Sequence, residues 1–182
     1  KAVGDLIFTS NGIRGPVVLD FAREITPLLD KYGEVPLLVS LTQGMNEEQI
    51  RQKLKEGTAK NPHANTIELL SSLLPLSVAR VLCEMAGVCG DMPPGKAEGA
   101  KRDALIKLLV AVPLTVIGHD GFKAAMITRG GVSLKEIDPK TMQSKLVMGL
   151  YFCGEVMDID GPCGGYNLQW AFSSGYTAGL LL

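Results

Sequence analysis

The chain has 182 residues, of which 46% are hydrophobic, and a formal net charge of −1. This length and apolar content suffice for a buried core in one large domain or two small ones. The near-neutral charge argues against nucleic acid as a partner. No apolar run reaches the roughly 20 residues of a membrane span. We therefore expect a cytoplasmic protein that binds neither nucleic acid nor a membrane.

The first 45 residues have mostly the sequence pattern of β-strands. Runs of apolar residues predict strands at residues 6–9 and 37–41. Between them, turn residues at Asn11-Gly12 and Gly15-Pro16 are followed by a short predicted helix at residues 17–25.

Residues 46–110 have the sequence pattern of α-helices. Apolar residues recur at helical spacing in three predicted helices, at residues 47–55, 66–85 and 98–110. Asn46 and Asn65 are predicted N-caps, and Gly57 and Gly87 are predicted helix ends. The loop at residues 90–96 is rich in glycine and proline, so we expect a mobile surface connection there.

After Pro113 the sequence again has the pattern of β-strands. Strands are predicted at residues 114–117, 122–128, 133–137 and 141–145, the first two joined by a hairpin turn at His119-Asp120-Gly121. We therefore expect a β-rich domain of residues 1–45 and 111–137, with residues 46–110 as an inserted helical subdomain.

The last third of the chain reads as strand, loop and helix. An apolar run, Leu150 to Cys153, stops at Gly154-Glu155, and a glycine-rich stretch leads into a helix with apolar positions at Leu168, Ala171 and Phe172. Such an arrangement places a carboxylate and free helix-start N–H groups at the end of a strand. Open α/β sheets bind ligands there.

This segment resembles the C-terminal flavin-contacting stretch of the BaiN/YhiN-like bacterial flavoproteins, a family of NAD(P)/FAD-dependent, aminoacetone-oxidase-like oxidoreductases. Further motifs that match its pattern lie at residues 4–9, 12–16, 128–132 and 142–145, so the resemblance covers nearly the whole chain. Arg14 departs from the small serine that the family tends to carry.

The resemblance implies an α+β fold with three parts. These are a β-barrel-like insert domain, its helical subdomain, and a C-terminal strand-loop-helix piece, residues 138–182, of a Rossmann-like FAD-binding domain. Such a protein should begin with a Gly-x-Gly-x-x-Gly turn, which this sequence lacks. We therefore interpret the chain as a fragment that ends in mid-helix at residues 180–182. We expect it to be inactive alone, with the N-terminal FAD-binding half of the same protein as its partner.

The resemblance also assigns cofactor contacts. Glu155 would accept hydrogen bonds from the ribityl chain of FAD, and the helix start would direct its N–H groups and dipole at the flavin pyrimidine edge. The predicted FAD-binding residues are Gly131, Gly154, Glu155, Gly164, Gly165, Tyr166, Asn167 and Leu168. The residues alone leave alternatives open: Glu155 could cap a neighbouring loop, and Gly164-Gly165 could serve only close helix packing.

Other candidate residues give weaker patterns. The four cysteines lack metal-ligand or redox-pair spacing, so we expect free thiols, with Cys163 as the exception because its loop should approach the cofactor. Arg129 is interpreted as either an anion ligand or a solvated side chain. The basic residues at 51–60 interleave with acids, which favours a solvated helix face over a nucleic-acid face. His63 and His119 lie in loops and indicate neither a metal ligand nor a base.

The resemblance implies a small-molecule substrate of unknown identity and NAD(P)H as a possible electron donor. It does not identify catalytic residues. A reading from a different class is also open, in which the chain is a non-catalytic module that binds a partner or a small anion through residues 161–167.

Overall fold

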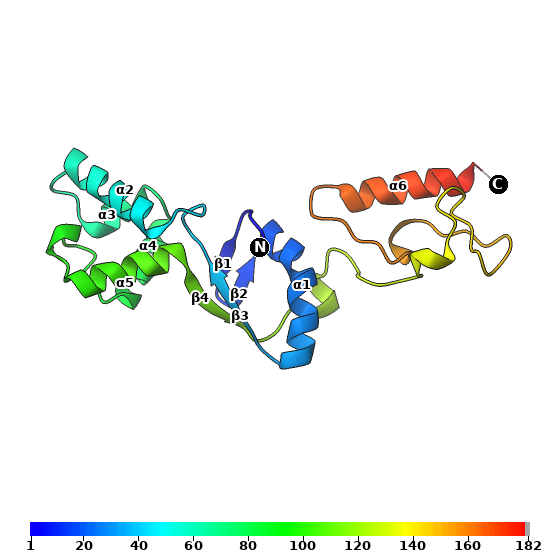
Figure 1. Ribbon diagram of the computed structural model, residues 1–182, viewed down its shortest axis with the longest axis horizontal. Coiled ribbons are helices and arrows are strands. Elements are labelled where there is room, and N and C mark those ends of the chain that lie inside the picture. The colour runs from blue at the N-terminus through cyan, green and yellow to red at the C-terminus, as the bar shows by residue number, and fades with distance from the viewer. Residues whose placement is uncertain (181–182) are drawn as a thin grey trace. The chain divides into compact units, whose positions relative to one another are not determined.

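The computed structural model describes residues 1–180, which divide into two compact units. The helical unit is Val35–Val116, and the discontinuous unit joins Lys1–Glu34 to the chain from Ile117 onward (Figure 1). The predicted boundaries of three parts, with borders after residues 45, 110 and 137, stay a prediction.

In the helical unit, one antiparallel strand pair brackets all the helices. Strands β3 (Val35–Val39) and β4 (Val112–Val116) pair with Val35 opposite Val116 and Val39 opposite Val112. The helices between them are α2 (Glu47–Lys60), α3 (Thr66–Ser71), α4 (Leu76–Met85) and α5 (Gly99–Val110), with a 3-10 turn, η1, at Pro94–Lys96. The chain therefore enters and leaves the helices through a single two-stranded ribbon.

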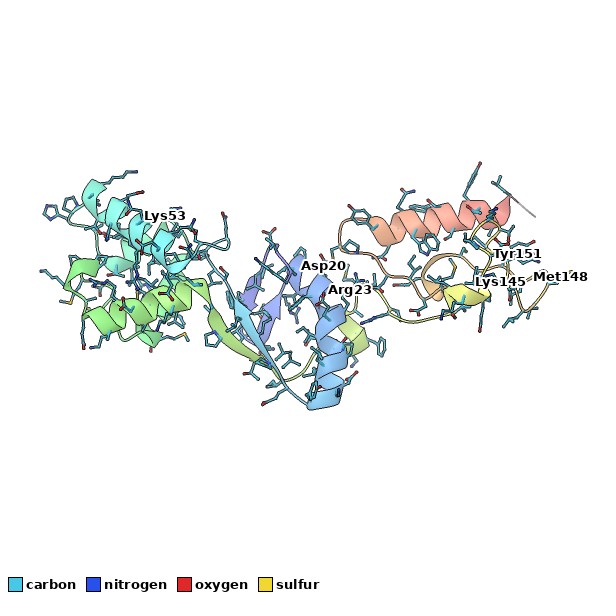
Figure 2. The ribbon with its side chains drawn as sticks, viewed as in Figure 1. Asp20, Arg23, Lys53, Lys145, Met148 and Tyr151 are labelled. Atoms are coloured by element: carbon cyan, nitrogen blue, oxygen red, sulfur yellow. The ribbon has the colours of Figure 1, made fainter. Side chains whose placement is uncertain are left out.

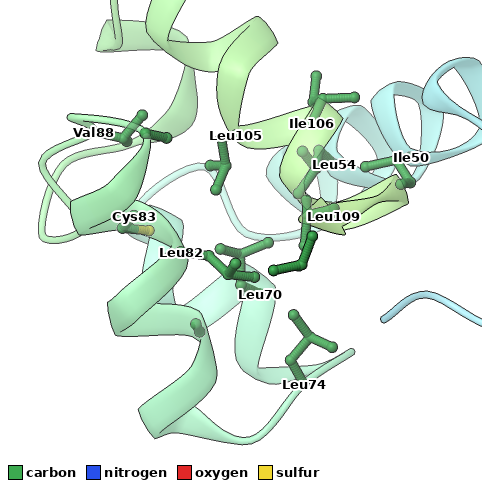
Figure 3. Packing of buried hydrophobic residues seen from close by; sticks show 13 residues of the cluster. Ile50, Leu54, Leu70, Leu74, Leu82, Cys83, Val88, Leu105, Ile106 and Leu109 are labelled. Atoms are coloured by element: carbon green, nitrogen blue, oxygen red, sulfur yellow. The ribbon is translucent and has the colours of Figure 1, made fainter. Parts of the chain in front are cut away.

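The core of the helical unit lies between the apolar faces of these helices (Figure 3). Ile50, Leu70 and Leu109 are fully buried, and Leu105 and Ile106 nearly so. Burial of such a side chain contributes about 1.5–3 kcal/mol. The periodic apolar residues that predicted the helices are thus the residues that stabilise the unit.

The predicted N-caps are confirmed. Asn46 Oδ1 accepts the N–H of Gln49 at 2.9 Å and Asn65 Oδ1 accepts that of Glu68 at 2.8 Å. In turn, the side chains of Gln49 and Glu68 accept the backbone N–H of their cap residues. Such capping boxes satisfy two helix-start N–H groups at once. Gly87, at φ 65°, follows the end of α4 as predicted.

Two helix boundaries differ from prediction. Gly57 does not end α2, which continues to Lys60. A Cβ at Gly57 would lie 3.0 Å from Leu69 Cδ2, so the glycine permits close packing of α3. The single helix predicted at residues 66–85 is two helices, because Pro75 disfavours a helical conformation in the residue before it and is the N-cap residue of α4.

The loop at residues 90–96 is tied to the start of α3. The carbonyls of Gly90 and Met92 accept the N–H groups of Ile67 and Thr66 at 3.1 and 2.9 Å. Thr66 Oγ1 also donates to the Met92 carbonyl at 2.7 Å. These contacts give the predicted surface connection a defined attachment.

The discontinuous unit begins with an antiparallel pair, β1 (Ile7–Thr9) and β2 (Gly12–Arg14), followed by α1 (Pro16–Tyr32). Helix α1 has 17 residues and continues past the predicted end at residue 25. It begins with a proline at its first position, which suits the missing N–H, and ends at Gly33 in the left-handed conformation.

From Ile117 to the last helix, α6 (Tyr166–Gly179), short turns stand where strands were predicted. The predicted strands at 122–128, 133–137, 141–145 and 150–153 are wrong within the described residues. This part instead contains 3-10 turns at Gly121–Ala124 (η2), Leu134–Glu136 (η3) and Gly154–Val156 (η4), and isolated bridges Val132 with Met157, Ile137 with Ser144, and Gln143 with Tyr151. The predicted hairpin at His119-Asp120-Gly121 is also wrong, because β4 pairs with β3.

Residues 1–180 thus form a mixed α/β structure with two two-stranded sheets and six α-helices. They do not confirm the predicted β-barrel-like insert, since two strands cannot close a barrel. Within the same residues, no helix is both long enough and apolar enough to span a membrane. The helix end predicted at residues 180–182 falls partly on Leu181 and Leu182, which lie outside the described residues.

Candidate functional site

The inner face of α6 holds the backbone of Gly154. Trp170 Nε1 donates to the Gly154 carbonyl at 3.2 Å, and the Gly154 N–H donates to Ser174 Oγ at 2.9 Å. Ser174 is buried, and its hydroxyl donates to the Trp170 carbonyl at 2.7 Å. Gly154 has φ 71°, a conformation that glycine adopts without strain. Helix α6 therefore fixes the glycine that precedes Glu155.

The start of α6 carries no side-chain cap. Gly165, the N-cap residue, has φ 88°, and Gly164 before it has φ 127°. A Cβ at Gly165 would meet no atom within 4 Å, so the helix start borders open space. The first-turn N–H groups lack helical partners, and with the helix dipole they form a positive end.

Asn167, a predicted cofactor contact, uses its side chain to hold the preceding loop. Its Oδ1 accepts the Gly161 N–H at 2.8 Å and its Nδ2 donates to the Gly161 carbonyl at 3.0 Å. A Cβ at Gly161 would lie 3.0 Å from the Tyr166 Cβ, so the loop approaches the helix closely. The side chain of Asn167 thus orders residues 161–167. Any cofactor contact of this residue stays a prediction.

Glu155 lies in η4 and is exposed, so the prediction that it lies at the end of a strand is wrong. Its Oε1 accepts the Thr128 N–H at 2.7 Å, which is the loop-capping contact left open as an alternative. The carboxylate remains accessible from solvent. This contact joins the Glu155 turn to the segment that contains Gly131.

Residues 128–132 lie directly against residues 154–158. The Val132 N–H donates to the Val156 carbonyl at 2.9 Å, and the Asp158 N–H donates to the Val132 carbonyl at 2.9 Å. At Gly131, with φ 149°, a Cβ would collide with the Val156 carbonyl oxygen. The structure therefore brings three predicted site residues, Gly131, Gly154 and Glu155, into one neighbourhood beside α6.

A hollow of about 240 Å³ lies beside the first turn of α6. It is smaller than the about 300–1,000 Å³ of a complete ligand pocket, so it would hold only part of a cofactor. Aromatic and proline side chains supply apolar walls, and a carboxylate and an amide supply polar ones. The lining residues are Ile159, Asp160, Gly161, Pro162, Tyr166, Asn167 and Trp170.

Two residues of α1 reach this site, and the sequence did not predict them. Asp20 Oδ1 accepts the Cys163 N–H at 2.6 Å, and Arg23 Nε lies 3.6 Å from Asp160 Oδ2 (Figure 2 labels Asp20 and Arg23). The Arg129 guanidinium donates to the Arg23 carbonyl, so Arg129 has a protein partner. Asp20 and Cys163 are 143 positions apart in the chain, and no local pattern links them.

The four cysteines are free, as predicted. Cys163 is exposed as a whole, yet partial desolvation of its thiol and then the hydrogen-bonded Asp20 carboxylate raise its pKa. Burial likewise raises the pKa of the Cys83 thiol. A raised pKa disfavours the thiolate at neutral pH. This argues against a reactive thiolate at Cys163, the exception named in the sequence analysis. In the described part of the chain, no three His, Cys, Asp or Glu residues group to hold a metal ion.

The basic run on α2 forms a solvated face of the helical unit. Arg51 pairs with Asp103 at 2.7 Å and with Glu47 at 3.5 Å, and these carboxylates are about half exposed. His119 Nδ1 accepts the Gly121 N–H at 3.0 Å within its own loop. Neither feature extends the candidate site.

Comparison with known proteins gives a family match over nearly the whole chain. The family described as "HI0933-like protein Rossmann domain" matches residues 9–181. The 3-dehydro-bile acid delta(4,6)-reductase of Clostridium scindens is 33% identical over 176 residues, 97% of this chain and 43% of that protein. The ribosomal RNA dihydrouridine synthases of Haemophilus influenzae and Escherichia coli are each 33% identical, over 96% and 94% of this chain and 41% and 40% of theirs. The chain thus spans about two fifths of the length of these curated relatives.

Proposed function

The chain belongs to the HI0933-like Rossmann domain family, and on that premise we propose that it is part of a FAD-dependent oxidoreductase. The match confirms the resemblance to BaiN/YhiN-like flavoproteins drawn from the sequence. In this proposal, the chain supplies the insert region and the C-terminal flavin-contacting segment. The remainder of a longer protein supplies the pyrophosphate-binding turn and is its partner.

The observation that carries the proposal is the uncapped start of α6, the helix whose Trp170 and Ser174 hold Gly154 in the neighbourhood of Gly131 and Glu155. The residues present fit a flavin, because the open space at Gly165 and the free N–H groups of the first turn suit a planar ring with acceptor atoms at its edge. The predicted residues Gly164, Gly165, Tyr166, Asn167 and Leu168 form this start.

The chain's own groups would bind and orient the cofactor. Helix-start N–H groups and the dipole of α6 would stabilise negative charge that develops at the pyrimidine edge. Glu155, anchored through Thr128, would accept hydrogen bonds from the ribityl hydroxyls. When bound, FAD supplies the capacity to transfer a hydride or electron pair. NAD(P)H as the electron donor rests on the resemblance alone and stays a prediction.

The relatives' names describe two different substrate classes, a bile acid and a ribosomal RNA. We propose a small-molecule substrate for this protein, because the net charge of this chain is −1 and Arg51, in the basic run on α2, pairs with two carboxylates. RNA-binding surfaces usually need an excess of positive charge. Binding of ribosomal RNA at physiological salt with micromolar or tighter affinity would contradict this choice.

The first test is a visible absorption spectrum of the protein produced from its complete native reading frame, compared with that of this 182-residue chain. We expect flavin bands at about 370 and 450 nm in the complete protein only. Absence of bands in both, even after FAD is added, would contradict the proposal and favour the non-catalytic module that binds through residues 161–167.

A pair of glycine variants sharpens this test in the complete protein. Gly131→Ala should push residues 128–132 off the Val156 carbonyl and lower FAD affinity about tenfold or more, since misplacing contacting groups loses binding energy. Gly175→Ala is the control, because a Cβ there meets no atom within 4 Å and φ is ordinary. Equal FAD affinity in the two variants would remove Gly131 from the site.

A further inference from the structure

The loop at residues 158–165 is held from two sides. On one side, α6 clamps Gly161 through both polar atoms of Asn167. On the other, α1 provides Asp20 for the Cys163 N–H at 2.6 Å and Arg23 for the Asp160 carboxylate at 3.6 Å. These contacts flank the hollow beside the first turn of α6.

The two α1 residues act on the same side of their helix. Asp20 and Arg23 are three positions apart, a spacing that puts side chains on one helix face. The Asp160 side chain is only 15% exposed, and a carboxylate so placed needs a polar or charged partner. The Arg23 carbonyl also accepts a hydrogen bond from Arg129, which belongs to the segment beside Gly131. One turn of α1 therefore contacts both segments that form the candidate site.

The loop needs such external contacts because its own sequence is flexible. Gly161, Gly164 and Gly165 surround the Cys163 contact, and glycine loses more backbone entropy on ordering than any other residue. Asn167 holds only the Gly161 end. Without Asp20, the chain from Pro162 to Gly164 would lose its attachment to α1, and the approach to the helix start would be less ordered.

We propose that Asp20 and Arg23 are positioning residues, which fix the loop against α1 and thereby set the geometry of the helix start that contacts the cofactor. This inference rests on the proposed function, and it adds residues that lie far from the cofactor-contacting segment in the sequence. A preorganised loop improves affinity because less conformational entropy is lost when the ligand binds.

The test measures FAD affinity of the complete protein by titrating the apoprotein. Asp20→Ala should weaken FAD binding about tenfold, and Asp20→Asn should stay near wild type because the amide oxygen still accepts the Cys163 N–H. Arg23→Ala should weaken binding less, by about threefold, since its ion pair is longer and partly exposed. Asp30→Ala, on an exposed position of the same helix, is the control and should bind FAD like wild type. The reduction potential of the bound flavin should become more negative in Asp20→Ala, since donors at the pyrimidine edge are displaced.

A second readout does not depend on FAD. In the same apoproteins at neutral pH, the alkylation rate of Cys163 by iodoacetamide is followed by peptide mass spectrometry, with the exposed Cys153 as internal reference. Asp20→Ala should speed the reaction at Cys163 and leave Cys153 unchanged, because the loop is released and the neighbouring carboxylate is removed.

The outcomes separate the two proposals. If wild type binds FAD and Asp20→Ala binds it equally well at an unchanged potential, the positioning role is overturned and the proposed function stands. If wild type binds no FAD, the proposed function fails, and an unchanged Cys163 rate in Asp20→Ala would also overturn the anchoring by α1. Weaker FAD binding by Asp20→Ala, together with FAD binding near wild type by Asp20→Asn, supports the positioning role over a general loss of fold. An unchanged circular dichroism spectrum of Asp20→Ala verifies that the fold is intact.

Discussion

The helical unit and the C-terminal part of the discontinuous unit are stabilised in different ways. In the described residues, the helical unit has a cluster of thirteen buried apolar residues, whereas the part around α6 has only four, Ile137, Met142, Met157 and Ala178. The part around α6 is held instead by backbone hydrogen bonds, by close packing at glycines, and by buried polar side chains such as Ser174, which bonds to Gly154. The comparison indicates that the first region is built for stability and the second for precise placement of backbone groups.

Helix α6 illustrates the difference most clearly. Leu168, Phe172 and Tyr176 recur every four residues, yet each residue is 65–72% exposed. The inward face of the helix instead carries Trp170 and Ser174, whose polar atoms hold Gly154. Apolar spacing on α6 therefore does not identify its packed face, although the same spacing does so for α2 and α5.

The largest expected effect is in the helical core. Leu109→Ala should lower the free energy of unfolding by about 2–5 kcal/mol, because Leu109 is fully buried and its loss leaves a cavity. Leu38→Ala, at a β3 residue that is 70% exposed, is the matched control. The measurement is urea unfolding followed by circular dichroism. Equal effects of the two substitutions would show that the cluster does not dominate the stability of the unit.

The same comparison explains what the sequence could predict. The helices between residues 46 and 110 were predicted because packing follows a local period, and their N-caps Asn46 and Asn65 obey local chemistry. The start of α6 was likewise visible from Gly164-Gly165. The break at Pro75 was missed because the apolar period continues across it.

The contacts around the candidate site depend on long-range packing, and local patterns do not encode it. Strand-like runs at 133–137 and 141–145 form bridges and turns, because few apolar neighbours exist to extend them into a sheet. The Thr128 contact of Glu155 and the Cys163 contact of Asp20 join residues 27 and 143 positions apart. The prediction that Gly131, Gly154 and Glu155 act in one site came from family resemblance, and the structure places them together.

An intermediate effect is expected at the polar clamp of α6. Ser174→Ala should destabilise the protein by about 1–3 kcal/mol, because the Gly154 N–H then lacks its acceptor in a buried position. Ser173→Ala is the neighbouring control, since Ser173 is exposed and its hydroxyl accepts a hydrogen bond from Gln169 Nε2 on the helix surface. Thermal unfolding of both variants gives the comparison. A larger effect for Ser173→Ala would contradict the assignment of the clamp to Ser174.

The smallest expected effect is at a polar contact of the helical unit that lies on its surface, the Arg51–Asp103 pair. Its hydrogen bond to Arg51 lowers the pKa of Asp103 below its ordinary value. A carboxyl whose pKa is lowered by folding stabilises the folded state above its unfolded pKa, and this contribution is lost as pH falls through the lower folded pKa. The difference in urea midpoint between wild type and Asp103→Asn should therefore be small at neutral pH and should shrink as pH falls below about 4. It should also vanish at about 1 M salt, which screens exposed pairs.

Asp91→Asn, at an exposed position of the same unit, controls for the loss of one negative charge. If Asp103→Asn lowered the free energy of unfolding more than Ser174→Ala does, this surface pair would stabilise the helical unit as strongly as polar contacts hold the region around α6, and the contrast between the two regions would fail. A difference that grew on acidification would contradict the lowered pKa of Asp103.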